Sequence, residues 1–128
     1  MMVRLKRRTS PVNYQLCNQT VTIYHWDRAE NTVTRRVIEK GAFLDFRKVH
    51  GIDKTGSTEV NSFLLVIPCD DEIPVAVEDK VFHGEGPEIT TREEWASFHP
   101  PKVPGLVVVK YVDPKYWNDQ LVHVEAGG

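Results

Sequence analysis

The five histidines are the residues of this chain with the clearest capacity for chemistry: His25, His50, His83, His99 and His123. No two of them stand two or four residues apart, the spacings that place two metal ligands on one face of a strand or a helix. His25, His83 and His123 fall in segments with strand character, so a barrel could still bring them together. A small metal-binding barrel is therefore one alternative for the function.

Motifs of catalysis are missing from the sequence. There is no Gly-x-Ser-x-Gly motif, and neither Cys17 nor Cys69 lies in a reactive-cysteine context, so both are expected to be free thiols. The glycine-containing segments 51–56 and 84–87 lack the order of a phosphate-binding loop and predict turns. We therefore expect no enzymatic activity, no metal and no cofactor.

Charge is unevenly distributed along the chain. The net charge is -2, and Arg4, Lys6, Arg7 and Arg8 put four positive charges in the first ten residues, which leaves -6 for the remainder. Such a basic arm is a candidate contact for DNA or for an acidic neighbouring subunit. The alternative is a solvated terminus with no partner.

Aromatic and basic residues interleave at Tyr24, Trp26 and Arg28. This composition is found in small barrels that bind nucleic-acid strands. The acidic remainder of the chain opposes a general phosphate-binding surface. A nucleic-acid-binding barrel is thus a second alternative, while core or subunit packing also explains the aromatic residues.

Short apolar and β-branched runs separated by turn residues dominate the rest of the chain. Strands are expected over 20–26, 32–39, 41–50, 59–67, 80–83, 105–112 and 121–125, with a turn beginning at Asp113-Pro114. In the first strand Val21 and Ile23 should face inward, and Gly41 should form a corner or bulge. Thr91 and Glu94 fit a capping box, and Thr90 and Glu93 fit one equally well one residue earlier; the pattern predicts a helix over about residues 91–98.

These elements predict a mainly β fold: a small antiparallel β-barrel or sandwich of six or seven strands with one short helix and a long projecting loop. We expect a flexible basic arm over 1–10, a single domain over 11–125 and a flexible tail over 126–128. The longest apolar runs are too short to cross a bilayer, so no membrane contact is expected.

The segment between the runs 41–50 and 59–67 is polar and has no apolar period of its own, which is typical of a loop. Loops carried by a rigid scaffold often bear function. The candidate loop residues are His50, Gly51, Ile52, Asp53, Lys54, Thr55, Gly56, Ser57 and Thr58. The alternative is a surface loop with no such role.

The layout of residues 15–128 resembles the small head-tail connector proteins of tailed bacteriophages and prophages, also called head-closure, stopper or minor capsid proteins. The resemblance rests on 18–24 with its hairpin, the corner 41–44, the unit 77–84 and the ending 123–128. Glu78-Asp79 departs from the Gly-Asp turn that is more usual in these proteins.

The resemblance implies a structural virion protein, made in the host bacterial cytoplasm and located at the head-tail interface. Its partners would be further copies of itself in a ring, a portal or adaptor protein, and tail proteins. Packaged double-stranded DNA would lie near the loop of residues 50–58, which would gate the channel. Arg4, Lys6, Arg7 and Arg8 would then lie against the portal or the DNA.

Overall fold

The protein is seen here in a computed structural model, which describes the backbone of residues 13–53, 56–100 and 102–128, and the side chains of these residues outside 47–61. The strands are β1 (Gln19–Asp27), β2 (Thr32–Asp53), β3 (Gly56–Pro68), β4 (Lys80–His83), β5 (Leu106–Val108), β6 (Tyr111–Trp117) and β7 (Gln120–Gly127), and the helix is α1 (Arg92–Ser97). The predicted mainly β fold with one short helix is confirmed.

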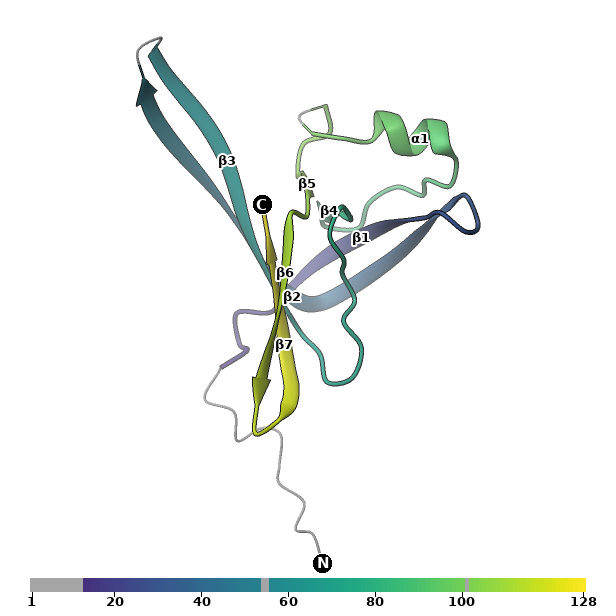
Figure 1. The fold of residues 1–128 in the computed structure, drawn as a ribbon, viewed down its shortest axis with the longest axis vertical. Coiled ribbons are helices and arrows are strands. Elements are labelled where there is room, and N and C mark those ends of the chain that lie inside the picture. Colours follow the sequence, from purple (N-terminus) through teal and green to yellow (C-terminus); the bar gives the residue numbers. More distant parts are fainter. Residues whose placement is uncertain (1–12, 54–55, 101) are drawn as a thin grey trace, which may run out of the picture.

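All strands belong to one antiparallel sheet with the order β5-β4-β1-β2-β3-β7-β6. β5 and β6 lie at its two ends, although only Val109 and Lys110 separate them in the chain. The Val109 N–H donates to the Asp79 carbonyl (2.9 Å), and the Lys110 N–H donates to the Gly127 carbonyl (2.7 Å). The sheet therefore curls into a half-barrel whose ends the chain itself connects (Figure 1).

This connection corrects two predictions. The segment 105–112 is not one strand, because it divides between β5 and β6 at opposite ends of the sheet. Asp113-Pro114 lies inside β6, where the outer edge of a terminal strand tolerates the missing N–H of proline. The turn comes later, at Asn118 and Asp119, which both have positive φ (51° and 61°) and lead into β7.

The corner predicted at Gly41 is a bulge in β2. The β1–β2 register passes from Val21↔Ile38 to Gln19↔Ala42, so β2 contains extra residues at this point. Lys40, with φ 50°, adopts the left-handed conformation next to Gly41. The bulge lets one continuous strand pair first with β1 and then with β3.

Two apolar clusters lie on opposite faces of β1. Val21 and Ile23 face the larger cluster, as predicted, together with Leu65, Val81 and Val124. The other face is buried as well. Thr22 and Tyr24, which the alternation placed outward, are fully buried, because the segment before α1 and the helix itself cover them.

The C-terminal residues are part of the sheet, which corrects the tail predicted over 126–128. Ala126 and Gly127 belong to β7 and are buried. The Phe63 N–H donates to the Gly128 carbonyl (3.3 Å). A Cβ at Gly127 would collide with the Tyr111 ring, so the small residues that suggested a tail instead permit close packing.

The segment predicted as a polar loop projects, but as paired strands. The β2–β3 ladder runs without interruption from Phe43↔Val66 to Asp53↔Gly56. The hairpin leaves the barrel at the upper left of Figure 1. A hairpin beyond the barrel has no core to face, so its sequence need not show the apolar alternation by which strands are recognised.

The capping box is confirmed. The Glu94 N–H donates to the Thr91 hydroxyl (3.1 Å), and the Thr91 N–H donates to the Glu94 carboxylate (3.1 Å). Hydrogen bonds from the Thr90 and Thr91 N–H groups lower the pKa of Glu94. Within the described residues, no helix is long and apolar enough to cross a membrane.

Replacing Thr91 by alanine should lower the free energy of unfolding by about 1 kcal/mol, because the Glu94 N–H loses its acceptor. Urea unfolding followed by tryptophan fluorescence measures the change. Thr90→Ala is the matched control, since it keeps the backbone N–H that contacts Glu94 (3.0 Å) and loses only a 3.5 Å hydroxyl contact. Equal losses in the two variants would contradict a specific role of the Thr91 cap.

Candidate functional site

The outer part of the β2–β3 hairpin has two open edges. β1 accompanies β2 only as far as Ala42, and β7 accompanies β3 only over Leu64–Pro68. Beyond these points each strand pairs only with the other among the residues that the structure describes. Their outer N–H and C=O groups are therefore available to another strand.

The base of the hairpin is fixed in the barrel. Leu44 and Phe63 are buried in the larger cluster, and the Leu44 N–H donates to the Gln19 side chain (2.7 Å). Phe46, which pairs with Phe63 in the ladder, is 47% exposed and meets the His83 ring edge-on. The hairpin is thus an extension of core strands.

The candidate loop residues are distributed along the outer hairpin. The backbones of residues 50–53 and 56–58 belong to the ladder, with Gly51 opposite Thr58 and Ile52 opposite Ser57. Lys54 and Thr55 lie outside the described residues. So do Arg4, Lys6, Arg7 and Arg8, the candidate portal or DNA contacts.

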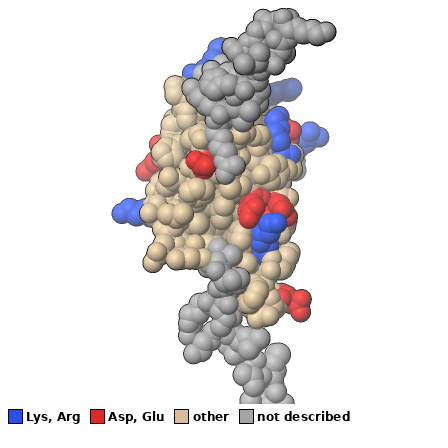
Figure 2. All heavy atoms as spheres, turned by 90° about the vertical axis from the view of Figure 1, so that its left-hand side faces the viewer, with Lys and Arg blue, Asp and Glu red and all other residues tan. Residues whose placement is uncertain are grey.

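Figure 2 shows the face of the molecule on the hairpin side of Figure 1. Among the described atoms, charged side chains of both signs are scattered over this face and uncharged residues occupy most of it. Phosphate-binding surfaces need clustered Lys and Arg.

The three strand histidines do not converge. His25 Nδ1 lies 2.6 Å from an Asp79 carboxylate oxygen. His123 contacts Tyr14 and Glu125, and His83 packs against Phe46. No group of three or more His, Cys, Asp or Glu side chains suited to a metal ion occurs among the described residues.

The His25–Asp79 pair holds a turn. Asp79 is buried, and its second carboxylate oxygen accepts the Ala76 N–H (2.9 Å). The Asp79 carbonyl also accepts the Val109 N–H, at the point where the chain crosses from β5 to β6. Burial raises the pKa of Asp79, while the hydrogen bonds from His25 and Ala76 act in the opposite direction. The pair therefore stabilises the crossing of the chain from β5 to β6.

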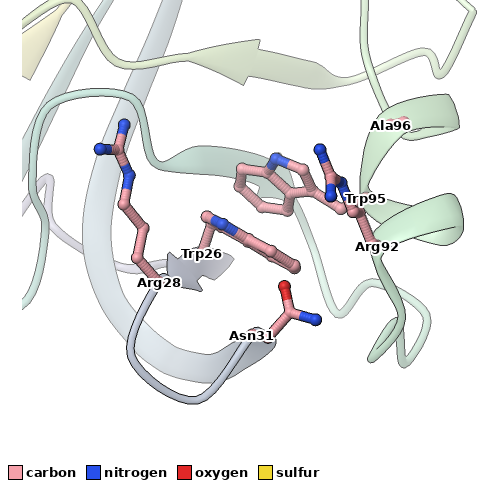
Figure 3. Close-up of a pocket in the computed structure, with 6 residues that line it drawn as sticks. All are labelled: Trp26, Arg28, Asn31, Arg92, Trp95 and Ala96. Carbon is pink, nitrogen blue, oxygen red and sulfur yellow. The ribbon is translucent and has the colours of Figure 1, made fainter.

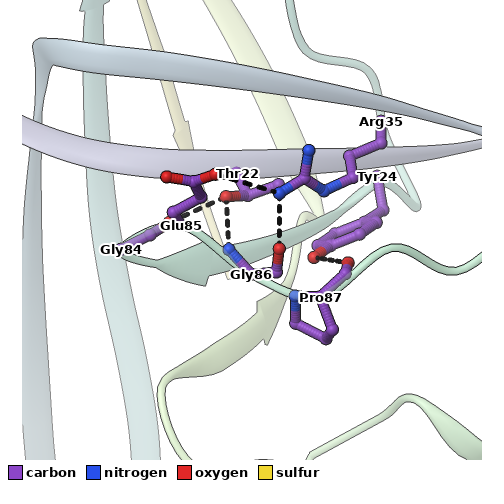
Figure 4. A network of polar contacts seen from close by, with 7 residues as sticks. All are labelled: Thr22, Tyr24, Arg35, Gly84, Glu85, Gly86 and Pro87. Atoms are coloured by element: carbon purple, nitrogen blue, oxygen red, sulfur yellow. Dashed lines mark hydrogen bonds and ion pairs between the residues drawn. The ribbon is translucent and has the colours of Figure 1, made fainter.

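The segment 84–87 is a turn and cannot cradle a phosphate (Figure 4). The Thr22 hydroxyl donates to the Gly84 carbonyl (2.7 Å) and accepts the Gly86 N–H (2.8 Å). The Tyr24 hydroxyl donates to the Pro87 carbonyl (2.6 Å), and the Arg35 guanidinium donates to the Gly86 carbonyl. The Gly84 N–H donates to the Thr20 carbonyl (2.8 Å). The Gly84 and Gly86 N–H groups, which a phosphate would need, therefore already have partners.

Neither cysteine is activated. Cys17 and Cys69 are free, as predicted, and burial raises the pKa of both thiols. Asp70 and Asp71 raise the pKa of Cys69 further. Because the thiolate is the nucleophile, these surroundings disfavour covalent chemistry at either residue.

Comparisons of the chain with protein-family models, curated proteins and solved structures gave no match. Geometry and residue chemistry therefore carry the functional proposal. The arrangement offers open strand edges, whereas His25 and the segment 84–87 make contacts that hold the fold together.

Sequence reasoning missed one further feature, a hollow between the β1–β2 turn and α1. Trp26 and Arg28 line it together with Trp95 from the helix. The sequence already showed Trp26 and Arg28 as neighbours. It had no signal for Trp95, because only the fold brings the helix to this end of β1.

Replacing His25 by alanine should make the stability fall as the pH rises from about 4 to 7. The pKa of Asp79 rises further in this variant, because the His25 hydrogen bond that lowered it is lost. A buried carboxyl with a raised pKa favours folding below its unfolded-state pKa, and this contribution is lost as the pH rises through the folded-state pKa. Urea unfolding at several pH values measures the effect.

The double variant His25→Ala/Asp79→Asn is the reference for this experiment, because it has no carboxyl to ionise at position 79. The single variant should lose stability relative to it between about pH 4 and 7. Parallel profiles for the two proteins would refute the role of the Asp79 carboxylate. His83→Ala, which removes an exposed ring, should follow the wild-type profile.

Replacing Gly86 by alanine should destabilise the protein by about 2 kcal/mol through overpacking. A Cβ there would overlap the Tyr24 hydroxyl and press against the Phe82 ring. Gly41→Ala is the control, because its Cβ would meet only a movable Ile38 methyl at 3.2 Å and a carbonyl at 3.6 Å. Thermal unfolding of both variants, and of Gly86→Ala combined with Tyr24→Phe, tests the clash. Strictly additive losses in the double variant would argue against it.

Proposed function

We propose that this chain is a structural virion protein of a tailed bacteriophage or prophage. In this role it forms part of the head-tail connector, a homo-oligomeric ring that closes the DNA-filled head and docks the tail. The observation that carries the proposal is the β2–β3 hairpin, which extends core strands beyond the barrel and leaves both outer edges open among the described residues.

The two open edges are unlike, and this favours a ring. One belongs to β2 and the other to β3. Contact between the β2 edge of one copy and the β3 edge of the next is head-to-tail, the kind of interface that closes into rings. If all hairpins point the same way, the two strands meet antiparallel, as they do within each hairpin. Main-chain hydrogen bonds then supply the affinity.

Exposed aromatic residues support contact with protein partners. Phe46, Tyr111 and Tyr116 are all more than 45% exposed, at 47%, 48% and 63%. Aromatic residues of this kind are enriched at the energetic centres of protein interfaces. In the proposed assembly the partners are neighbouring copies, a portal or adaptor protein, and tail proteins.

The gate follows from the same geometry. A collar of hairpins around an axis would place residues 50–58 at the channel, next to packaged double-stranded DNA. The basic residues Arg4 to Arg8 would lie against the portal or the DNA. The role is structural, and the proposal assigns no catalytic residue and no cofactor to the chain.

Replacing residues 51–58 by Asn-Gly tests the proposal. This two-residue turn suits a hairpin and leaves the pair His50↔Glu59 in place. The variant should keep the barrel, shown by unchanged tryptophan fluorescence and near-ultraviolet circular dichroism. Its filled particles should lose DNA, which nuclease-protection assays measure. Full retention of DNA in those particles would refute the gate.

Oligomeric state distinguishes the gate from the ring itself. Native mass spectrometry of the wild-type protein should show a closed oligomer. A variant truncated further, with residues 47–62 replaced by Asn-Gly so that the pair Phe46↔Phe63 flanks the turn, should be monomeric. Its barrel should remain folded, because Leu44 and Phe63, which anchor the hairpin, are retained. A wild-type protein that is monomeric at all concentrations and does not assemble on portal-containing heads would refute the connector proposal.

A further inference from the structure

A hollow of about 430 Å³ lies between the β1–β2 turn and α1 (Figure 3). It is lined by Trp26, Arg28, Asn31, Arg92, Trp95 and Ala96. The first three come from the end of β1 and the turn that follows, and the others come from the helix. The hollow lies at the opposite end of β2 from the projecting hairpin.

Its aromatic wall is held in place. The Trp26 and Trp95 rings stack with centroids 6.1 Å apart and an interplanar angle of 29°. Lys80 Nζ lies 4.0 Å from the Trp95 ring centroid and donates to the Trp95 carbonyl (2.7 Å). Lys80 is itself buried, so water does not compete with the Trp95 ring for its ammonium group. A preformed wall lowers the entropy cost of binding a flat ligand.

Arginine and asparagine side chains surround this wall. Arg28 and Arg92 are exposed, and neither forms an ion pair or a side-chain hydrogen bond within the described part of the chain. The Asn31 amide is likewise without a described partner. Arg35 and Arg36, by contrast, each contact a carboxylate. No carboxylate lines the hollow.

We infer that this hollow binds a nucleotide, either free or as part of a single strand. The base would stack against Trp26, and the phosphates would be held by Arg28 and Arg92. The Asn31 amide, which has both donors and an acceptor, would contact the edge of the base. Aromatic stacking combined with Arg contacts is the chemistry by which proteins hold unpaired bases.

The combination of groups selects this ligand over two others. Acidic peptides would satisfy the arginines but would not use the fixed aromatic wall. Duplex DNA would meet the arginines with its phosphates, but its bases are stacked on each other and cannot reach a tryptophan. The proposed ligand is therefore distinct from packaged duplex DNA.

Tryptophan fluorescence measures the binding directly. Trp117→Phe is a suitable background, because it removes the tryptophan at the exposed tip of β6 and leaves Trp26 and Trp95 as reporters. In this background (dT)₈ or deoxyadenosine monophosphate should quench the fluorescence saturably. Tighter binding of (dT)₈ would assign the site to a strand, and equal or tighter binding of the mononucleotide would assign it to the free nucleotide.

Arg28→Glu and Arg92→Glu should each weaken binding at least about tenfold, since a charge-assisted phosphate contact is replaced by repulsion. Both side chains are exposed, so the variants should fold. Lys102→Glu is the matched control, because it makes the same charge change at an exposed residue outside the hollow and should leave binding unchanged.

Three results would overturn the inference. They are the absence of saturable quenching with either nucleotide probe, unchanged binding in both arginine variants, and equal competition by tripolyphosphate or hexaglutamate, which lack a base. A blunt duplex that binds as tightly as (dT)₈ would also overturn it, since stacking on Trp26 would then have no role. None of these results depends on ring formation, so the hairpin proposal stands or falls separately.

Discussion

The continuity of β2 is the constraint on which the rest of the structure depends. This strand of 22 residues pairs with β1 up to Ala42 and with β3 from Phe43 onward. The bulge next to Gly41 makes the change of partner possible without breaking the strand. Leu44 of β2 is buried in the core, and the same strand continues in an unbroken ladder to Asp53. The hairpin is therefore anchored directly in the barrel. A projecting element built from paired strands is stiffer than a loop, which would suit the proposed pairing with neighbouring copies in a defined register.

A link of two residues connects the two ends of the sheet. Val109 and Lys110 connect its two ends, and their N–H groups bond to Asp79 and Gly127. The buried Asp79 carboxylate is tolerated because Ala76 and His25 satisfy it. The His25–Asp79 pair thus resembles the orienting half of a catalytic triad in its distances, yet it serves to hold a crossing point. His25, His83 and His123 each make a contact within the fold.

Much of this fold could be predicted from residue patterns, and the failures have physical causes. Local signals worked: the β-branched alternation of β1 and the capping box at Thr91 depend on neighbours in sequence. Tyr24 was misplaced because the segment around Pro87 and α1 cover its face of the sheet, and only tertiary structure reveals that cover. The hairpin was read as a loop because strands outside a core lose the apolar period. The hollow at Trp26 could not be foreseen for the same reason as Tyr24, since its second wall comes from the helix.

The two surfaces proposed to bind partners lie at opposite ends of β2, and their chemistry differs accordingly. The hairpin offers main-chain edges, which pair with any strand of suitable direction and need no particular side chains. The hollow offers side chains only, fixed by stacking and by Lys80. A strand of 22 residues extends at most about 70 Å, and the bend at the bulge shortens that span. The proposed assembly and the proposed nucleotide site therefore use different parts of one subunit, so the assembly contacts along the hairpin would leave Trp26 and Arg28 uncovered by the hairpin's own partner strand.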